Sequence, residues 1–133
     1  KMIKNGGGRI VIISSFGALA PMPKSAVYSG IKSGIHAYGR SISAELKDKN
    51  ISVTVSMPGY VKTNAHTRSG LDHLEKKVPE WMWISADQVV RETEKASRSG
   101  KNQIIPGRVY KLTKPFLKYQ IAITIWQSIT KKN

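Results

Sequence analysis

Three consecutive segments within residues 9–56 place the strongest constraint on the fold. The segment "RIVIIS", residues 9–14, is β-branched and apolar without alternation, which predicts a strand buried on both faces. From residue 25 to about residue 49 apolar residues recur every three or four positions, as in one long helix, and "ISVTVS", residues 51–56, predicts a second strand. A strand, a helix and a strand in this order form a right-handed crossover with parallel strands. The sequence therefore predicts an α/β fold whose sheet is covered by helices on both faces.

Glycines and turn residues mark the remaining elements. Gly6, Gly7 and Gly8 precede the first strand, whereas a phosphate-binding loop follows a strand and opens a helix, so they indicate a turn that leads into the strand. Residues 60–84 are irregular and predict a loop with short helical turns. A second helix is expected from Ser85, which has capping-box spacing to Gln88, up to Gly100, and "NQIIPG" predicts a short third strand.

Length and composition limit the classes of protein that need to be considered. A chain of 133 residues is long enough for one domain, and no apolar run reaches the roughly 20 residues that span a bilayer. The absence of cysteine excludes disulfides, thiolate nucleophiles and zinc–thiolate sites, and the pattern favours a cytoplasmic protein. Two or three parallel strands cannot cover their own helices, so the chain resembles the second half of a larger domain.

The pair formed by Tyr28 and Lys32 in "YSGIK" is the first candidate for chemistry. Four residues apart on a helix, the two side chains project from one face. An ammonium close to a phenol lowers the pKa of the phenol and allows it to exchange protons near neutral pH. On its own the pair is more often a solvated helix pair without function.

Two further segments end at the same edge of the predicted sheet. Ser15 follows the first strand, thirteen residues before Tyr28, and "MPGYVKT", residues 57–63, follows the second strand. Ligands of open parallel sheets bind at this edge. In this order and spacing, "IISS", "YSGIK" and "PGYVKT" resemble the C-terminal half of a classical short-chain dehydrogenase/reductase over roughly residues 5–63.

This resemblance implies a role for each matching residue. Tyr28 would be the acid–base of hydride transfer, and Lys32 would lower the pKa of Tyr28 and bind the nicotinamide ribose. Ser15, rather than its neighbour Ser14, would hydrogen-bond the substrate carbonyl. The remaining cofactor contacts would come from the segment after the second strand, at Pro58, Gly59, Val61 and Thr63. The first two of these are equally explained as a turn that ends a strand.

The resemblance also implies a fold and a cofactor. Residues 1–111 would be the C-terminal part of a doubly wound parallel-sheet Rossmann-type domain, and residues 112–133 a basic amphipathic extension. The cofactor would be NAD or NADP, with NADP slightly favoured, but the glycine-rich loop that binds it would precede Lys1. A chain that begins Lys1-Met2 fits a fragment, which we expect to be inactive alone.

Residues 64–84 would correspond to the substrate loop of the family. Trp81 and Trp83 would form an apolar lid over a lipophilic ketone or alcohol, and packing against the core is an equal alternative. His36, His66 and His73 lack metal-ligand spacing, so we expect no metal site.

The charge of +14 is concentrated after Glu94, where no acidic residue occurs. From Lys114 the apolar residues recur in four-residue steps, which favours a helix edged by lysines, although a strand also fits. Such a helix suits either an anionic membrane surface or docking on its own domain or a partner subunit. The alternative function is therefore a basic, non-catalytic module for a membrane surface or nucleic acid. Nucleic acid is the less favoured partner because no recognition motif is present, and the family resemblance implies a homo-oligomer.

Overall fold

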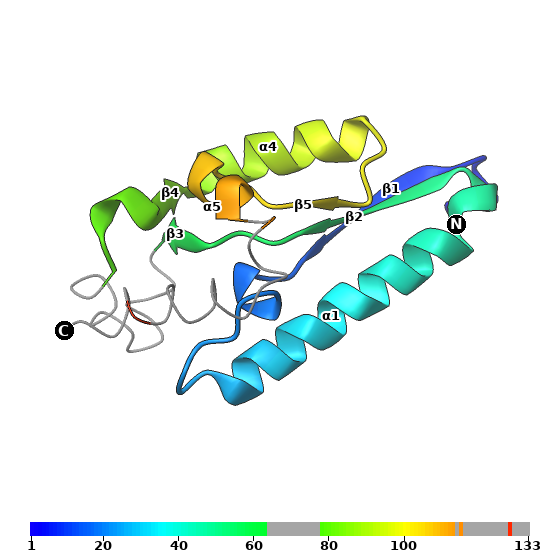
Figure 1. Ribbon diagram of the computed structural model, residues 1–133. Helices are drawn as coiled ribbons and strands as arrows, with labels where there is room; N and C mark the ends of the chain where they lie inside the picture. The colour runs from blue at the N-terminus through cyan, green and yellow to red at the C-terminus, as the bar shows by residue number, and fades with distance from the viewer. Residues whose placement is uncertain (64–77, 114, 116–127, 129–133) are drawn as a thin grey trace.

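The computed structural model describes residues 1–63, 78–113, 115 and 128. Its main sheet has three parallel strands in the order β1-β2-β5, formed by β1 (Gly8–Ile13), β2 (Ile51–Ser56) and β5 (Gln103–Ile104). Helix α1 (Ala26–Glu45) lies on one side of this sheet and helix α4 (Ala86–Arg98) on the other (Figure 1). The predicted α/β fold, with parallel strands between two layers of helix, is confirmed.

Helix α1 follows the predicted boundaries closely. It begins after Ser25, and a 3-10 turn, η2 (Lys47–Lys49), continues it to Asn50, which is left-handed at φ 54°. The helix lies against β2 at Gly39, where an added Cβ would stand 2.4 Å from the Cγ2 atom of Val55. A residue without a side chain is therefore required for this close contact.

Part of the apolar stripe that identifies α1 in the sequence is exposed, whereas Ile35, Ile42 and Leu46 are half-buried. Val27, Ile31 and Tyr38 are 78%, 59% and 62% exposed, whereas the buried positions of the helix are Ser29 and Gly39. Periodicity located the helix correctly, but its close approach to β2 is made at Gly39 and not at the exposed apolar residues.

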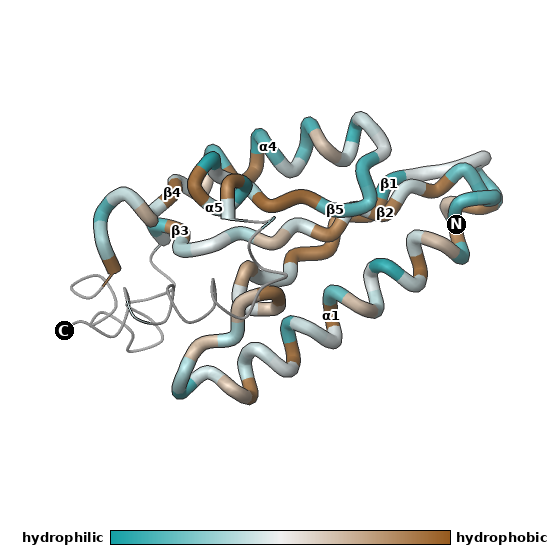
Figure 2. The backbone as a smooth tube through the Cα atoms, viewed as in Figure 1, coloured by the Kyte–Doolittle hydropathy of each residue, from teal (hydrophilic) through white to brown (hydrophobic). Residues whose placement is uncertain are grey.

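The prediction that the first strand is buried on both faces is wrong for the described residues. Strand β1 alternates between half-buried and exposed positions, and Val11 and Ile13 are exposed. The reason is topological, because β1 is an edge strand and only β2 pairs with it in the described sheet. Figure 2 shows that the hydrophobic strands lie between two helices of mixed hydropathy.

Residues 60–84 contain two strands that the sequence did not predict. Strands β3 (Tyr60–Lys62) and β4 (Trp83–Ser85) pair in parallel with Tyr60 opposite Trp83, and a 3-10 turn, η3 (Glu80–Met82), leads into β4. The expected helical turn is thus present, together with a small second sheet. A strand of three residues is too short to show periodicity in the sequence.

The predicted ends of α4 are confirmed. The Ser85 hydroxyl oxygen accepts a hydrogen bond from the Gln88 N–H at 3.1 Å, and Gly100 has φ 68° after the last turn. The Gln88 side chain donates to Glu92 at 2.8 Å. Of the two hydrogen bonds of a capping box, only the one accepted by the serine is therefore present among the described residues. The predicted third strand is β5.

The short helix α5 (Arg108–Thr113) is anchored to α4 through Glu92. The Glu92 carboxylate forms an ion pair with Lys111 and lies 3.4 Å from the Gly107 amide nitrogen. Burial raises the pKa of Glu92, but the hydrogen bonds from Lys111, Gln88 and Gly107 and the charge of Lys111 outweigh burial and hold the pKa below its usual value. The position of α5 therefore depends on a charged contact.

We expect Glu92→Gln to lower the free energy of unfolding by about 1 kcal/mol at neutral pH, because the Lys111 contact loses its charge. A group whose pKa is lower in the folded protein stabilises the fold above its unfolded pKa, and this contribution is lost as the pH falls through the folded pKa. The difference between wild type and variant should therefore be largest above pH 4.5, the ordinary pKa of the group, and shrink below it. Denaturant titrations across this pH range measure it. Glu94→Gln is the control, since Glu94 pairs with Arg9 and Arg98 away from α5; equal losses in both variants would contradict the anchoring role of Glu92.

The predicted tail helix from Lys114 onward lies outside the described residues, and the division at residues 111 and 112 stays a prediction. Within residues 1–63 and 78–113, no helix has the length and apolar character needed to cross a bilayer.

Candidate functional site

The segments predicted to meet at one edge of the sheet do so. Strands β1 and β2 run in register, with Ile13 opposite Ser56, so both end at the same level. Ser15 follows β1, Pro58 and Gly59 follow β2, and the first turn of α1 with Tyr28 lies at the same end of the molecule (Figure 1). We refer to this end as the rim.

The two adjacent serines at the rim have different surroundings. Ser14 is buried, and its hydroxyl donates to the Lys32 carbonyl oxygen at 2.8 Å, which ties the end of β1 to α1. Ser15 is half-buried and caps the 3-10 turn η1 (Phe16–Ala18), where its hydroxyl oxygen accepts from the Gly17 N–H at 3.1 Å. Ser15 can still donate a hydrogen bond through its own O–H, as a group that binds a carbonyl oxygen must.

Gly17 lies close to both Ser15 and Tyr28. A Cβ built on Gly17 would stand 3.4 Å from the Ser15 Oγ atom and 3.4 Å from the Tyr28 Cε1 atom. The serine hydroxyl and the tyrosine ring therefore flank the same point of the backbone, and the tyrosine is 50% exposed. The structure brings these two predicted site residues together at an accessible position.

Lys32 contacts the ring of Tyr28. The Nζ atom lies 5.7 Å from the ring centroid, which is within the range of a cation–π contact. The two side chains share one face of α1, as the four-residue spacing predicts.

The turn after β2 is bound to the turn after β1. The Phe16 N–H donates to the Pro58 carbonyl oxygen at 2.8 Å. The pKa of Tyr60 is raised, chiefly by burial and secondly by the charge of Tyr28. The segment that begins at Pro58 thus lies beside the turn that follows Ser15.

Tyr110 on α5 is a rim residue that sequence analysis missed. Its side chain is fully buried, and its hydroxyl donates to the Met82 carbonyl oxygen at 2.6 Å and accepts from the Tyr60 N–H at 2.9 Å. Burial raises the pKa of Tyr110, so the hydroxyl keeps its proton. A single tyrosine in a basic segment carries no signal that could have identified it.

The two tryptophans of the predicted lid differ in their packing. Trp83 lies against Tyr60, with ring centroids 5.5 Å apart, and its indole N–H donates to the Val78 carbonyl oxygen at 3.2 Å. Trp81 is exposed, and Met82 between them is buried in the core. Core packing, the alternative considered from the sequence, therefore describes Trp83 better than Trp81.

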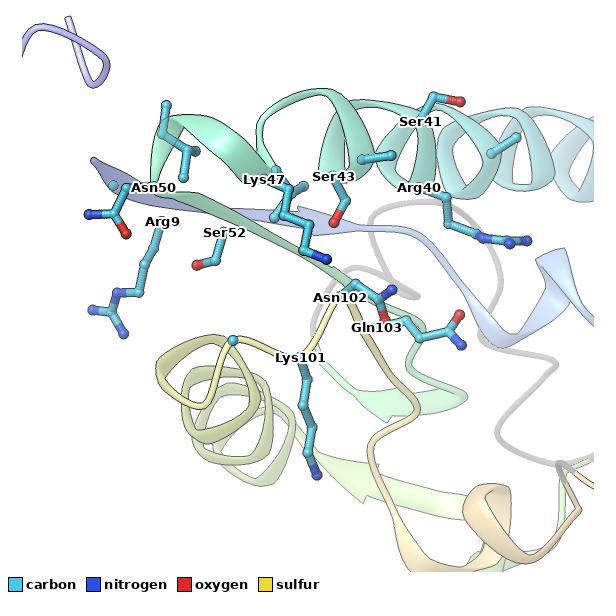
Figure 3. Close-up of a pocket in the computed structure, with 16 residues that line it drawn as sticks. Arg9, Arg40, Ser41, Ser43, Lys47, Asn50, Ser52, Lys101, Asn102 and Gln103 are labelled. Atoms are coloured by element: carbon cyan, nitrogen blue, oxygen red, sulfur yellow. The ribbon is translucent and has the colours of Figure 1, made fainter. Parts of the chain in front are cut away.

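A large cavity among the described residues lies elsewhere. It measures about 1340 Å³ and opens between α1 and the start of β5, beside the first residues of β1 and β2. Arg40, Ser43 and Lys47 come from its α1 side, and Lys47 reaches across toward Asn102 (Figure 3). Since Tyr28 and Ser15 lie at the opposite ends of these elements, the cavity is not part of the rim.

Among the residues that the structure describes, no group of three histidine or acidic side chains could hold a metal ion. His36 contacts the Gln103 side-chain oxygen at 3.2 Å, and His66 and His73 lie outside the described residues.

Comparisons with known proteins agree with this arrangement. A family model described as short chain dehydrogenase matches residues 1–73. The chain is 41% identical over 73 residues to Dehydrogenase/reductase SDR family protein 7-like of Drosophila melanogaster, covering 52% of this chain and 22% of that protein. It is 32% identical over 108 residues to Dehydrogenase/reductase SDR family member 4 of Rattus norvegicus, covering 81% of this chain and 35% of that protein.

A solved structure shows the same fold. A short chain dehydrogenase from Burkholderia cenocepacia, crystallised in complex with NADP, matches with a TM-score of 0.74 at 20% identity, over 94% of this chain and 49% of that chain. The present chain thus spans less than half the length of each of these relatives. Its described fold is the corresponding part of a Rossmann-type domain. Because the family model covers more than half of the chain and the parallel sheet agrees, this protein belongs to the short chain dehydrogenase family of oxidoreductases.

Proposed function

We propose that this chain supplies the acid–base half of an NAD(P)-dependent oxidoreductase that interconverts a carbonyl and a hydroxyl group. The observation that carries the proposal is that the Ser15 hydroxyl oxygen and the Tyr28 ring each lie 3.4 Å from the point that a Cβ on Gly17 would occupy. A group that binds a carbonyl oxygen and a group that protonates it must both reach that oxygen, and these two side chains are adjacent and accessible.

Each residue has a distinct task in the proposed reaction. The nicotinamide supplies the hydride that adds to the carbonyl carbon. Tyr28 gives its phenolic proton to the carbonyl oxygen, and Ser15 donates a hydrogen bond to that oxygen as negative charge develops there. Lys32, next to the Tyr28 ring, favours the phenolate that is left behind because its positive charge is close. In the opposite direction the phenolate accepts the proton of the alcohol.

The chemistry of the rim residues fits a nicotinamide nucleotide. Lys32 and Tyr28 offer donors for ribose hydroxyls, the backbone at Val61 would lie near the carboxamide, and Thr63 is an exposed residue whose hydroxyl would serve the amide or a phosphate. Pro58 and Gly59 set the direction of this backbone after β2. NAD and NADP both fit this set of groups.

Two further features of the proposal concern the substrate and assembly. The exposed ring of Trp81, which directly precedes the buried Met82, suits a lipophilic ketone or alcohol. The exposed apolar stripe of α1 suits pairing with a second copy of the protein.

The proposal is tested in the full-length protein of the gene with variants of the two serines. We expect Ser15→Ala to lower kcat for carbonyl reduction about 100-fold or more, because one donor to the developing oxyanion is lost. Ser14→Ala is the matched control, because the Ser14 hydroxyl already donates to the Lys32 carbonyl oxygen. We expect Ser14→Ala to lower the melting temperature and to have only a small effect on kcat. Titration calorimetry with NADH and NADPH identifies the preferred nucleotide. Wild-type protein that binds neither nucleotide, or a Ser15→Ala variant as active as wild type, would contradict the proposal.

A further inference from the structure

Tyr110 occupies an unusual position at the beginning of the small β3–β4 sheet. Tyr60 is the first residue of β3 and pairs with Trp83, which directly follows Met82. In a parallel ladder the N–H of one residue can bond the carbonyl of the residue that precedes its partner. Here the Tyr60 N–H could in this way bond the Met82 carbonyl oxygen directly. The Tyr110 hydroxyl instead stands between these groups, at 2.9 Å from the Tyr60 nitrogen and 2.6 Å from the Met82 oxygen. The Tyr110 hydroxyl thus sets the spacing of β3 and β4 where the two strands begin.

The ring of Tyr110 fixes the turn that precedes β3. A Cβ on Gly59 would stand 2.0 Å from the Tyr110 Cζ atom, so the ring lies directly against the backbone of Gly59. The same ring meets Phe16 edge-on, with centroids 4.9 Å apart. Because Phe16 is also bonded to the Pro58 carbonyl, Tyr110 contacts the turns that follow both β1 and β2.

We propose that Tyr110 is a positioning residue for the nicotinamide side of the rim. Its hydroxyl holds the backbone from Gly59 to Val61 at the distance from β4 that cofactor binding requires. This inference rests on the proposed function, since Val61 is there assigned to the carboxamide. Without the hydroxyl, the Tyr60 N–H and the Met82 carbonyl either lose their partner or move together, and in both cases the backbone at Val61 is displaced.

The position of this hydroxyl depends on a segment far from the rim in sequence. Tyr110 belongs to α5, which Glu92 of α4 holds through Lys111 and Gly107. Fifty residues separate Tyr110 from Tyr60. The segment after the third strand therefore takes part in building the cofactor side of the rim.

The test compares Tyr110→Phe with Thr54→Val in the full-length protein. Each variant removes one buried hydroxyl and keeps nearly the same shape, but Thr54 donates to the Lys101 carbonyl at 2.6 Å, away from the rim. We expect Tyr110→Phe to raise the KM and Kd for the preferred nicotinamide nucleotide about tenfold, the loss typical of one hydrogen bond, with kcat changed less than about threefold. Thr54→Val should leave KM and Kd unchanged. A merely structural role predicts the same values for both variants and would overturn the inference.

Amide hydrogen exchange gives a readout that does not depend on turnover. The Tyr60 amide should exchange about tenfold faster in Tyr110→Phe and at the wild-type rate in Thr54→Val. In the wild-type protein, saturating nucleotide should slow the exchange of the Val61 region; unchanged exchange there would overturn the inference even if Tyr110→Phe fails to fold. A wild-type protein that binds no nucleotide contradicts the proposed function itself, whereas an active wild type with an unaffected Tyr110→Phe contradicts only the role of Tyr110.

Discussion

Tyr28→Phe in the full-length protein should lower kcat by about two to four orders of magnitude, because it removes the proposed proton donor. The ring that contacts Lys32 and flanks Gly17 is kept, and the side chain is half exposed, so the fold should hardly change. We expect the melting temperature to stay within about 2 °C of wild type, as for most surface substitutions. Steady-state reduction of a carbonyl substrate, followed through nucleotide oxidation, measures the effect.

Tyr38→Phe is the matched control for this experiment. Tyr38 lies on the same helix, is more exposed than Tyr28 and is ten residues away from it. The same atom is removed from the same residue type, so only the position relative to the rim differs. Wild-type activity in Tyr38→Phe is expected, and comparable activity in Tyr28→Phe would rule out Tyr28 as the acid–base.

Gly59→Ala should be the most destabilising single substitution considered for the described residues. The added Cβ would overlap the Tyr110 ring, with three ring atoms within 2.5 Å. The overlap cannot be relieved by a rotation of the tyrosine, because its hydroxyl is bonded to Tyr60 and Met82. We expect a loss of about 3 kcal/mol or more in the free energy of unfolding, at the upper end for overpacked sites. Urea denaturation followed by circular dichroism measures it.

Gly34→Ala is the control that should change stability in the opposite direction. Its Cβ would meet nothing within 4 Å, and it lies in the interior of α1, where alanine is favoured over glycine by about 1 kcal/mol. A second comparison combines Gly59→Ala with Tyr110→Leu, which makes room for the methyl group. If the Tyr110 ring is the obstacle, the double variant should lose less free energy of unfolding than the sum of the losses in the two single variants. Additive losses would show that the damage at Gly59 has another origin.

The sequence alone was sufficient to predict the main sheet and the helices around it. The strand at residues 51–56, the helix that begins after Ser25 and the helix between Ser85 and Gly100 are where local patterns place them. These elements are long, and their signals are local, consisting of hydrophobic period, capping serine and terminal glycine. The meeting of Ser15, Tyr28 and Pro58 at one edge was also predictable, because parallel strands end on the same side.

Burial and long-range contacts were decided by the tertiary structure. An apolar run cannot show whether its strand is central or at an edge, which is why the exposure of Val11 and Ile13 was not predicted. Likewise the helical period of α1 does not reveal that the helix approaches β2 most closely at Gly39 while Val27, Ile31 and Tyr38 stay exposed. Burial depends on the neighbours that the fold supplies and not on the segment itself.

The candidate site divides in the same way. The sequence determined which residue types stand at the rim, since the order and spacing of Ser15, Tyr28 and Lys32 are local properties of the chain. Only the tertiary structure decided that Ser15 and Tyr28 both lie beside Gly17 and that Tyr110 links β3 to β4. A hydrogen bond between residues fifty positions apart leaves no periodic trace in a sequence, because it is created when the chain folds and brings the two residues together.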